Sequence, residues 1–437
     1  MALPMLIGIL SAVGFNLVDT YFVGQLGANE LAAMGFSFPV AMIAGGISMG
    51  LGNGASALIS RAIGAGDMHR VQRLTSDSIV LASVIVGCFI LIGLLTIDPL
   101  FTAMGAKPDV LIHIRRYMHI WYPGMFFLVI PMVGNNAIRA TGDTKTPGLV
   151  MLISIGLNVV LDPLFIFGIG PFPRWEIAGA AFASLMARSL AFVIAIWILI
   201  KRENMITFTH PNLSEVLQSW KQILYIGIPH AATNIIRPVG AGAVTKIVAA
   251  YGVHAVAAFG VAMRIDALAL VVIMALSSVF GPFIGQNLGA RKFDRIMQGL
   301  KFTHRFAMVW GIFALVVLIA ASTPIASIFS GDRNVIETIV LYLYIVPIGY
   351  GFFGIYALSN AAFNVLNKPL NALSLTVIQM IVLYIPLAYA GSLWIGLPGI
   401  FAALALANAA TGTLAYFWIR KTARQQFAML AAQGNSS

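Results

Sequence analysis

The sequence predicts an all-α polytopic membrane protein with twelve transmembrane helices in two six-helix lobes. The lobes should be related by a pseudo-twofold axis along the membrane normal. Of the 437 residues, 59% are hydrophobic and only 9% are charged, and the mean hydropathy is +0.92. Soluble domains carry about 25% charged residues. Long apolar stretches alternate with short polar loops, and the second half of the chain repeats the first.

Each apolar stretch is long enough to cross a bilayer, which takes about 20 helical residues. The stretches cover residues 3–24, 31–63, 76–105, 112–138, 147–170, 177–200, 221–250, 255–288, 303–329, 336–366, 370–391 and 396–419. Several of them exceed the required length, so tilted or bent helices are expected.

The repeat has a fixed offset of 225 residues over most of each half. Gly64-Ala65 corresponds to Gly289-Ala290, and Tyr117 corresponds to Tyr342. The offset then falls by three, so that Pro147 corresponds to Pro369. Since six spans return the chain to its starting side, the two halves should have parallel orientation.

The polar stretch 201–220 is the expected linker between the lobes. We therefore predict an N-terminal lobe over residues 1–200, a cytoplasmic linker over 201–220 and a C-terminal lobe over 221–437. Two such bundles suit transport by alternating access.

The net charge of +11 reflects membrane topology. If the N-terminus is cytoplasmic, most Lys and Arg residues fall in the inner loops, as the positive-inside rule requires. Both termini are then cytoplasmic, and no nucleic-acid partner is needed to explain the charge. The sequence also contains no GxxxxGK[ST] loop and no catalytic constellation, which argues against ATP-driven transport and against an enzyme.

Asp19 is an acidic residue in the middle of the first apolar stretch. A carboxylate at that depth costs roughly 2.5–3.5 kcal/mol on insertion scales, so we expect a proton, a metal ion or a cationic ligand to use it. Its repeat counterpart is Val244, so this acid is confined to the first half.

The fifth stretch adds further oxygen donors. Asn158 and Asp162 are separated by four residues and should lie on one helix face, whereas their counterparts are Ile381 and Ile385. Ser184 lies in the sixth stretch, and Asn16 and Thr20 lie beside Asp19. Oxygen donors suit a hard cation or a shared proton. Alternatively, such groups only form hydrogen bonds between helices, or Asp162 marks a helix end near the membrane interface.

The motifs that carry these residues resemble those of the multidrug and toxic compound extrusion (MATE) family, in particular its bacterial DinF-type branch. The matching segments are LPMLIG, NLVDTYFVGQLG, MGLGNGASALISRAIGAGD, NNAIRATGDTKTP, LNVVLDPLFIFGIG, AGAAFAS, GVAMRIDALAL and GPFIGQNLGA. Together they extend over nearly the whole chain.

The resemblance implies a cation-coupling site in the first lobe, made of Asp19, Asn158, Asp162 and Ser184 and able to hold H+ or Na+. It also identifies an asparagine of the fourth span, Asn136 or alternatively Asn135, as an accessory residue. Pro4 supplies a point where the first helix can bend. No other bound cofactor is expected.

The second lobe departs from the family pattern, because another branch of the family has a glutamate at the position of Arg237. A cation site is therefore not expected there. Our hypothesis is that an ion-pair network forms from Arg237, Lys246, Arg264 and Asp266.

The resemblance implies a secondary active multidrug efflux antiporter that exports cationic or amphipathic compounds in exchange for H+, or alternatively Na+. We expect a monomer in the bacterial inner membrane, in contact with lipid. An alternative function is a flippase for lipid-linked oligosaccharides or other amphiphiles. A membrane-embedded enzyme or a structural protein is a further alternative, which the absence of a catalytic set and the duplicated design disfavour.

Overall fold

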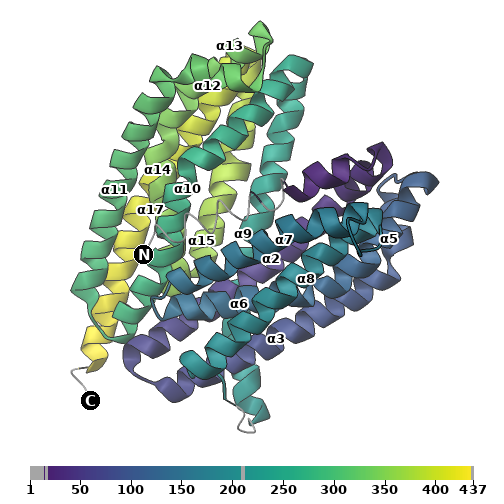
Figure 1. Cartoon of the computed structure of the whole chain (residues 1–437). Coiled ribbons are helices and arrows are strands. Elements are labelled where there is room, and N and C mark those ends of the chain that lie inside the picture. The colour runs from purple at the N-terminus through teal and green to yellow at the C-terminus, as the bar shows by residue number, and fades with distance from the viewer. Residues whose placement is uncertain (1–13, 15–17, 208–211, 435–437) are drawn as a thin grey trace. The chain divides into compact units, whose positions relative to one another are not determined.

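The computed structural model describes residues 14, 18–207 and 212–434, and within these ranges the chain is helical with no β-strand (Figure 1). The predicted all-α fold is thereby confirmed. Pro4 and Asn16, which the sequence singled out, lie outside the described residues.

The chain forms two compact units, residues Met1–Ala231 and Ala232–Ser437. The first unit contains α2 (Ala28–Ala65), α3 (Met68–Leu95), α4 (Ile97–Ala103), α5 (Pro108–Gly124), α6 (Phe126–Ala140), α7 (Lys145–Phe167), α8 (Glu176–Trp197) and the π-helix η1 (Ile198–Arg202). The boundary lies within α9 (Leu213–Ala249), a continuous helix that begins inside the stretch predicted as a linker.

The second unit contains the remaining elements. They are α10 (Val253–Gly289), α11 (Phe293–Ala320), α12 (Ser322–Phe329), α13 (Arg333–Ile345), η2 (Val346–Gly349), α14 (Tyr350–Val365), α15 (Pro369–Val377), the π-helix η3 (Ile378–Tyr384), α16 (Ile385–Ile395) and α17 (Leu397–Gly434). Figure 1 shows α11, α14 and α17 side by side, and α14 packs directly against both others.

Local sequence explains where several helices begin and end. Gly66 ends α2 in the left-handed conformation, at φ 75°, which a glycine adopts without strain. Asp67 then caps α3 by accepting a 2.9 Å hydrogen bond from the backbone N–H of Arg70. Pro108 and Pro369 stand at the first positions of α5 and α15, where a missing N–H has no cost.

Ten helical segments of the described residues are long and apolar enough to cross a membrane. Two of the twelve predicted spans are not among the ten. One is the first, of which residues 14 and 18–24 are described and helical, and the other is the seventh, which falls within α9. With these two, the layout fits the predicted twelve-helix fold.

A π-helix explains a small irregularity in the repeat. Pro147 and Pro163 are 16 residues apart in α7, whereas Pro369 and Pro386 in the second half are 17 apart. The π-helix η3 lies between the latter two, while α7 is a regular α-helix. A π-bulge accommodates one extra residue within a helix, so the second half keeps its helix despite the insertion.

Candidate functional site

The fifth and sixth predicted spans bring three of the predicted site residues together. Asn158 and Asp162 of α7 are fully buried, and Ser184 of α8 is 2% exposed. The Nδ2 of Asn158 donates a hydrogen bond to Oδ1 of Asp162 at 3.0 Å. The same nitrogen donates a second hydrogen bond to Oγ of Ser184 at 3.5 Å. The four-residue spacing therefore places the amide and the carboxyl on one helix face, with Ser184 beside them.

Asp19 joins this group from the helical segment 18–24. Its side chain is 5% exposed, and its carboxyl group lies next to that of Asp162. Two neighbouring buried carboxyl groups repel each other when both are ionised, which favours a state in which they share a proton. The two acids thus form a pair suited to share one proton.

Arg188 and Tyr117 complete the cluster, although the sequence did not single them out as site residues. Arg188 of α8 lies close enough to Asp19 for their charges to attract each other, and Tyr117, a buried residue of α5, lies beside the same groups. Arg188 follows Ser184 by four residues and so lies one turn along the same face of α8. The four-residue spacing from Ser184 could have pointed to Arg188 as a site residue. The recurrence of Tyr117 as Tyr342 in the second half could have pointed to the tyrosine.

Three oxygen atoms in the cluster are buried without a hydrogen-bond donor. They are Oδ1 of Asp19, Oδ2 of Asp162 and Oδ1 of Asn158. A buried acceptor left without a partner costs about 1–3 kcal/mol. With both acids ionised, two carboxylates and the Arg188 guanidinium sum to one negative charge, which one proton or one monovalent cation would neutralise. Oxygen-only donors fit a hard cation as well as a proton.

Two predicted accessory residues have other surroundings. Asn136 of α6 donates to the backbone oxygen of Met132 at 2.7 Å, accepts a hydrogen bond from Arg139 and packs against Gly52 of α2. None of these partners belongs to the acid cluster. Thr20 is exposed, next to the buried Asp19. The described residues also contain no group of three or more His, Cys, Asp or Glu side chains placed to hold a metal ion.

The second unit contains an acid with a different environment. Asp266 of α10 accepts hydrogen bonds from the phenols of Tyr342, at 2.5 Å, and Tyr350. Within the described ranges no ion pair joins Asp266 to Arg237, Lys246 or Arg264. The hypothesis of an ion-pair network was therefore wrong: tyrosine hydroxyls, rather than cations, stabilise this carboxyl group.

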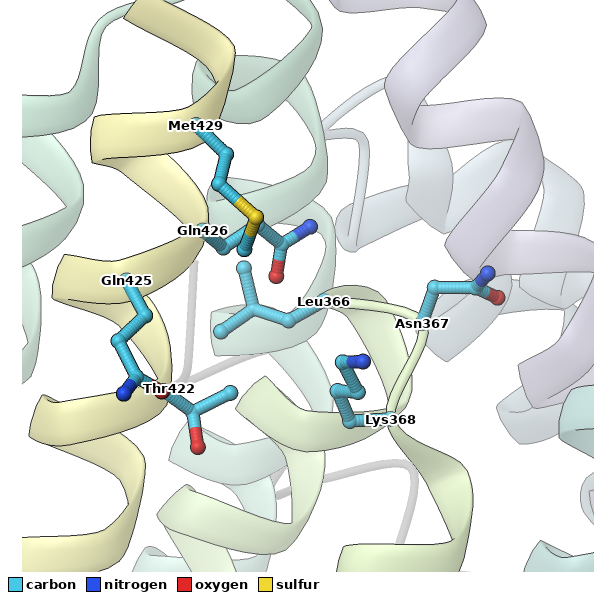
Figure 2. Close-up of a pocket in the computed structure, with 7 residues that line it drawn as sticks. All are labelled: Leu366, Asn367, Lys368, Thr422, Gln425, Gln426 and Met429. Carbon is cyan, nitrogen blue, oxygen red and sulfur yellow. The ribbon is translucent and has the colours of Figure 1, made fainter.

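A cavity of about 250 Å³ lies elsewhere in the second unit, between the α14–α15 connection and the end of α17 (Figure 2). Its walls are formed by Leu366, Asn367, Lys368, Thr422, Gln425, Gln426 and Met429. None of the predicted site residues lines this cavity, so it is separate from the acid cluster.

Known proteins resemble this chain along most of its length. A family model described as MatE matches residues 4–164 and again 229–390, and these matches begin 225 residues apart, as the repeat predicts. An FAD transporter from Shewanella oneidensis is 37% identical over 417 residues, covering 95% of this chain and 92% of the relative. The multidrug export protein MepA from Staphylococcus haemolyticus is 26% identical, covering 95% and 91%.

A solved structure gives the same result for the fold. The Vibrio cholerae MATE transporter VcmN in its bent form aligns with a TM-score of 0.92 and 31% sequence identity, covering 97% of this chain and 95% of that one. The protein is a multi-pass membrane transporter for small molecules, not an enzyme. This follows from its helical membrane fold and from the match of the MatE family model to both halves of the chain. The chain belongs to the MATE family, which confirms the resemblance found in its motifs.

Proposed function

We propose that this protein is a secondary active efflux antiporter that exports amphipathic compounds, including cationic drugs, in exchange for H+. The observation that carries the proposal is the buried carboxyl pair of Asp19 and Asp162, with Arg188 beside it. Its relatives with multidrug names support the export of drugs. The mechanism requires only that the pair gains and loses one proton.

The ionised pair carries a net negative charge next to Arg188, and the buried oxygen atoms without donors make this state unfavourable. A proton that enters from the outside offsets this cost, and so does a cationic substrate that reaches the same charge. Proton and substrate then compete for one negative charge, directly or through conformation. Alternating access converts this competition into exchange, because a lobe that has taken up a proton no longer favours the substrate.

We favour H+ over Na+ as the coupling ion. Two neighbouring buried carboxyl groups favour sharing one proton over ionising together, and Arg188 already contributes one positive charge to the cluster. A sodium ion remains compatible with the oxygen donors of Asp19, Asn158, Asp162 and Ser184. We further propose a bacterial inner-membrane location with cytoplasmic termini, because Lys and Arg gather in the loops on that side.

The test is efflux of a fluorescent cation from proteoliposomes under separately imposed pH and sodium gradients. The wild type should respond to the pH gradient, and Asp19→Asn should lose this response while it is produced at a normal level. Asp98→Asn is a matched control, because Asp98 is half-exposed and pairs with Arg115. Efflux driven by sodium alone would overturn H+ coupling, and normal coupling in Asp19→Asn would overturn the role of the pair.

A second candidate function is export of flavin adenine dinucleotide (FAD). The name of the Shewanella relative suggests it, and an arginine inside the second unit, Arg237, favours an anionic substrate over a cationic one. Vesicles loaded with FAD and, separately, with ethidium would distinguish the two candidates. Release of FAD that depends on Asp19 supports this candidate, and release of ethidium alone rejects it.

A further inference from the structure

Arg237 lies on the face of α9 that packs into the second unit. It precedes Val244 by seven residues and Val248 by eleven, and both valines are completely buried in the hydrophobic core of this unit. Residues at these spacings share one helix face. Ile235 and Val239, on the other side of the helix, are 42% and 66% exposed. The guanidinium group therefore points into the helical unit.

The guanidinium of Arg237 stacks on an aromatic ring. Its central carbon lies 4.8 Å from the centroid of Phe353 of α14, a side chain that is 4% exposed. Stacking fixes the plane of a guanidinium and leaves the N–H groups at its edge available for hydrogen bonds. Tyr356, itself buried, packs against Phe353 with its ring 5.8 Å away and so holds that ring in place.

No acid neutralises this charge in the described part of the chain. Arg237 forms no ion pair within 4 Å there, and Asp266 of the same unit accepts hydrogen bonds from Tyr342 and Tyr350 instead. An ionisable side chain inside a membrane-spanning bundle is expensive and usually functional. An anion that reached Arg237 would offset the cost of its burial.

We propose that Arg237 and Phe353 form a substrate-binding subsite for a phosphate-bearing aromatic compound. The N–H fork of Arg237, held in place by Phe353, would bind a phosphate through two parallel hydrogen bonds. Combined with FAD export, this gives a flavin or adenine nucleotide as the ligand class. This inference rests on the second candidate function, FAD export, and assigns its anion recognition to two residues.

The test measures equilibrium binding to the full-length protein in detergent by flavin fluorescence. The probes are FAD, flavin mononucleotide and riboflavin, which has the same ring system and no phosphate, with ethidium as a cationic probe. Arg237→Gln should weaken binding of FAD and flavin mononucleotide about tenfold or more and leave riboflavin and ethidium within about twofold. Arg237→Lys, which keeps the charge without the planar fork, should give an intermediate loss.

Arg264→Gln is the matched control, because Arg264 is an exposed arginine of α10 in the same unit. It should bind all four probes as the wild type does. A uniform loss across the four probes in Arg237→Gln would assign the residue a structural role and overturn the subsite, as would unchanged FAD binding.

The outcomes also separate the inference from the function on which it rests. If the wild type exports FAD and Arg237→Gln exports it equally well, the function stands and the subsite is wrong. If the wild type binds flavin mononucleotide through Arg237 but neither binds nor exports FAD, the subsite stands and the FAD function is wrong. If no phosphate-bearing probe binds, both are wrong.

Discussion

The phenol of Tyr342 donates a 2.5 Å hydrogen bond to Asp266 in the second unit. Its repeat counterpart, Tyr117, lies beside Asp19 and Asp162 in the first. Each half of the molecule thus places an acid against the corresponding tyrosine, although the acids come from helices that do not correspond. The two halves therefore share the tyrosine, but a different helix carries the carboxyl group in each half.

Replacing Tyr342 by Phe should destabilise the second unit. The variant removes one of the two phenol donors of Asp266 and leaves Tyr350 as the other. A hydrogen bond contributes about 0.5–1.5 kcal/mol, or about 1.5–3 kcal/mol where one partner is charged, so the free energy of unfolding should fall by about 0.5–3 kcal/mol. The measurement is unfolding in detergent by heat or denaturant.

The control for this variant is Tyr344→Phe, because Tyr344 belongs to the same helix and is 47% exposed. It should unfold as the wild type does. Equal stability of Tyr342→Phe and the wild type would show that the hydrogen bond to Asp266 contributes nothing to stability.

Arg188→Gln should change how transport depends on pH. Without the guanidinium, the ionised acid pair loses the positive charge that stabilises it. The pair then releases its proton less readily, so half-maximal efflux should occur at a more alkaline pH than in the wild type. The measurement is efflux of a fluorescent cation from proteoliposomes at a series of pH values. Arg174→Gln, at an exposed arginine of the same unit, should leave the profile unchanged.

Sequence reasoning predicted the parts of the site that depend on spacing within one helix. Asn158 and Asp162 are four residues apart, so their common face followed from helix geometry alone. Asp19 could be selected because an intramembrane carboxylate is costly wherever its helix lies. The fold class followed from hydropathy and from the repeat, both of which are local properties of the chain.

What the sequence did not predict depends on how helices are rotated against each other. Arg188 and Tyr117 meet the acids only because α8 and α5 present these faces to the cluster, and no spacing within one helix gives that rotation. For Asp266 we expected cationic partners, yet two tyrosines lie closer. The one-residue insertion is visible in the spacing of Pro369 and Pro386, but the π-helix η3 that accommodates it is visible only in the structure.

Asp143, in the loop between α6 and α7, should make stability depend on pH. It accepts hydrogen bonds from Thr146 Oγ1 at 2.5 Å and from Arg202 Nη2 at 2.6 Å. Partial burial opposes its ionisation, but the hydrogen bonds from Thr146 and the charge of Arg202 outweigh it, so the pKa of Asp143 lies below its ordinary value of 3.8. Its contribution to stability is complete above the unfolded pKa and is lost as the pH falls through the folded pKa.

Asp143→Asn should therefore unfold at a lower temperature than the wild type at pH 7. The difference should begin to shrink once the pH falls below about 4, where the unfolded state takes up a proton at this residue, and should go on shrinking towards the lower pKa of folded Asp143. Thermal unfolding in detergent from pH 3 to pH 7 provides the measurement. A difference that is constant over this range would show that ionisation of Asp143 is not the cause.

Gly179→Ala should disrupt the packing that holds the acid cluster together. A Cβ at Gly179 of α8 would lie 2.3 Å from the backbone oxygen of Phe165 in α7, so the two helices could no longer approach this closely. Such overpacking costs about 1–3 kcal/mol, and separating α7 from α8 would also separate Asn158 from Ser184. Stability and coupled efflux should therefore both fall.

Gly156→Ala is the matched control, because a Cβ at this position of α7 meets no other atom within 4 Å. Alanine is the better helix former by up to about 1 kcal/mol, so this variant should be as stable as the wild type or more stable, with normal efflux. If the two alanine variants behaved alike, the close approach of α7 and α8 would not be what positions Ser184 beside Asn158.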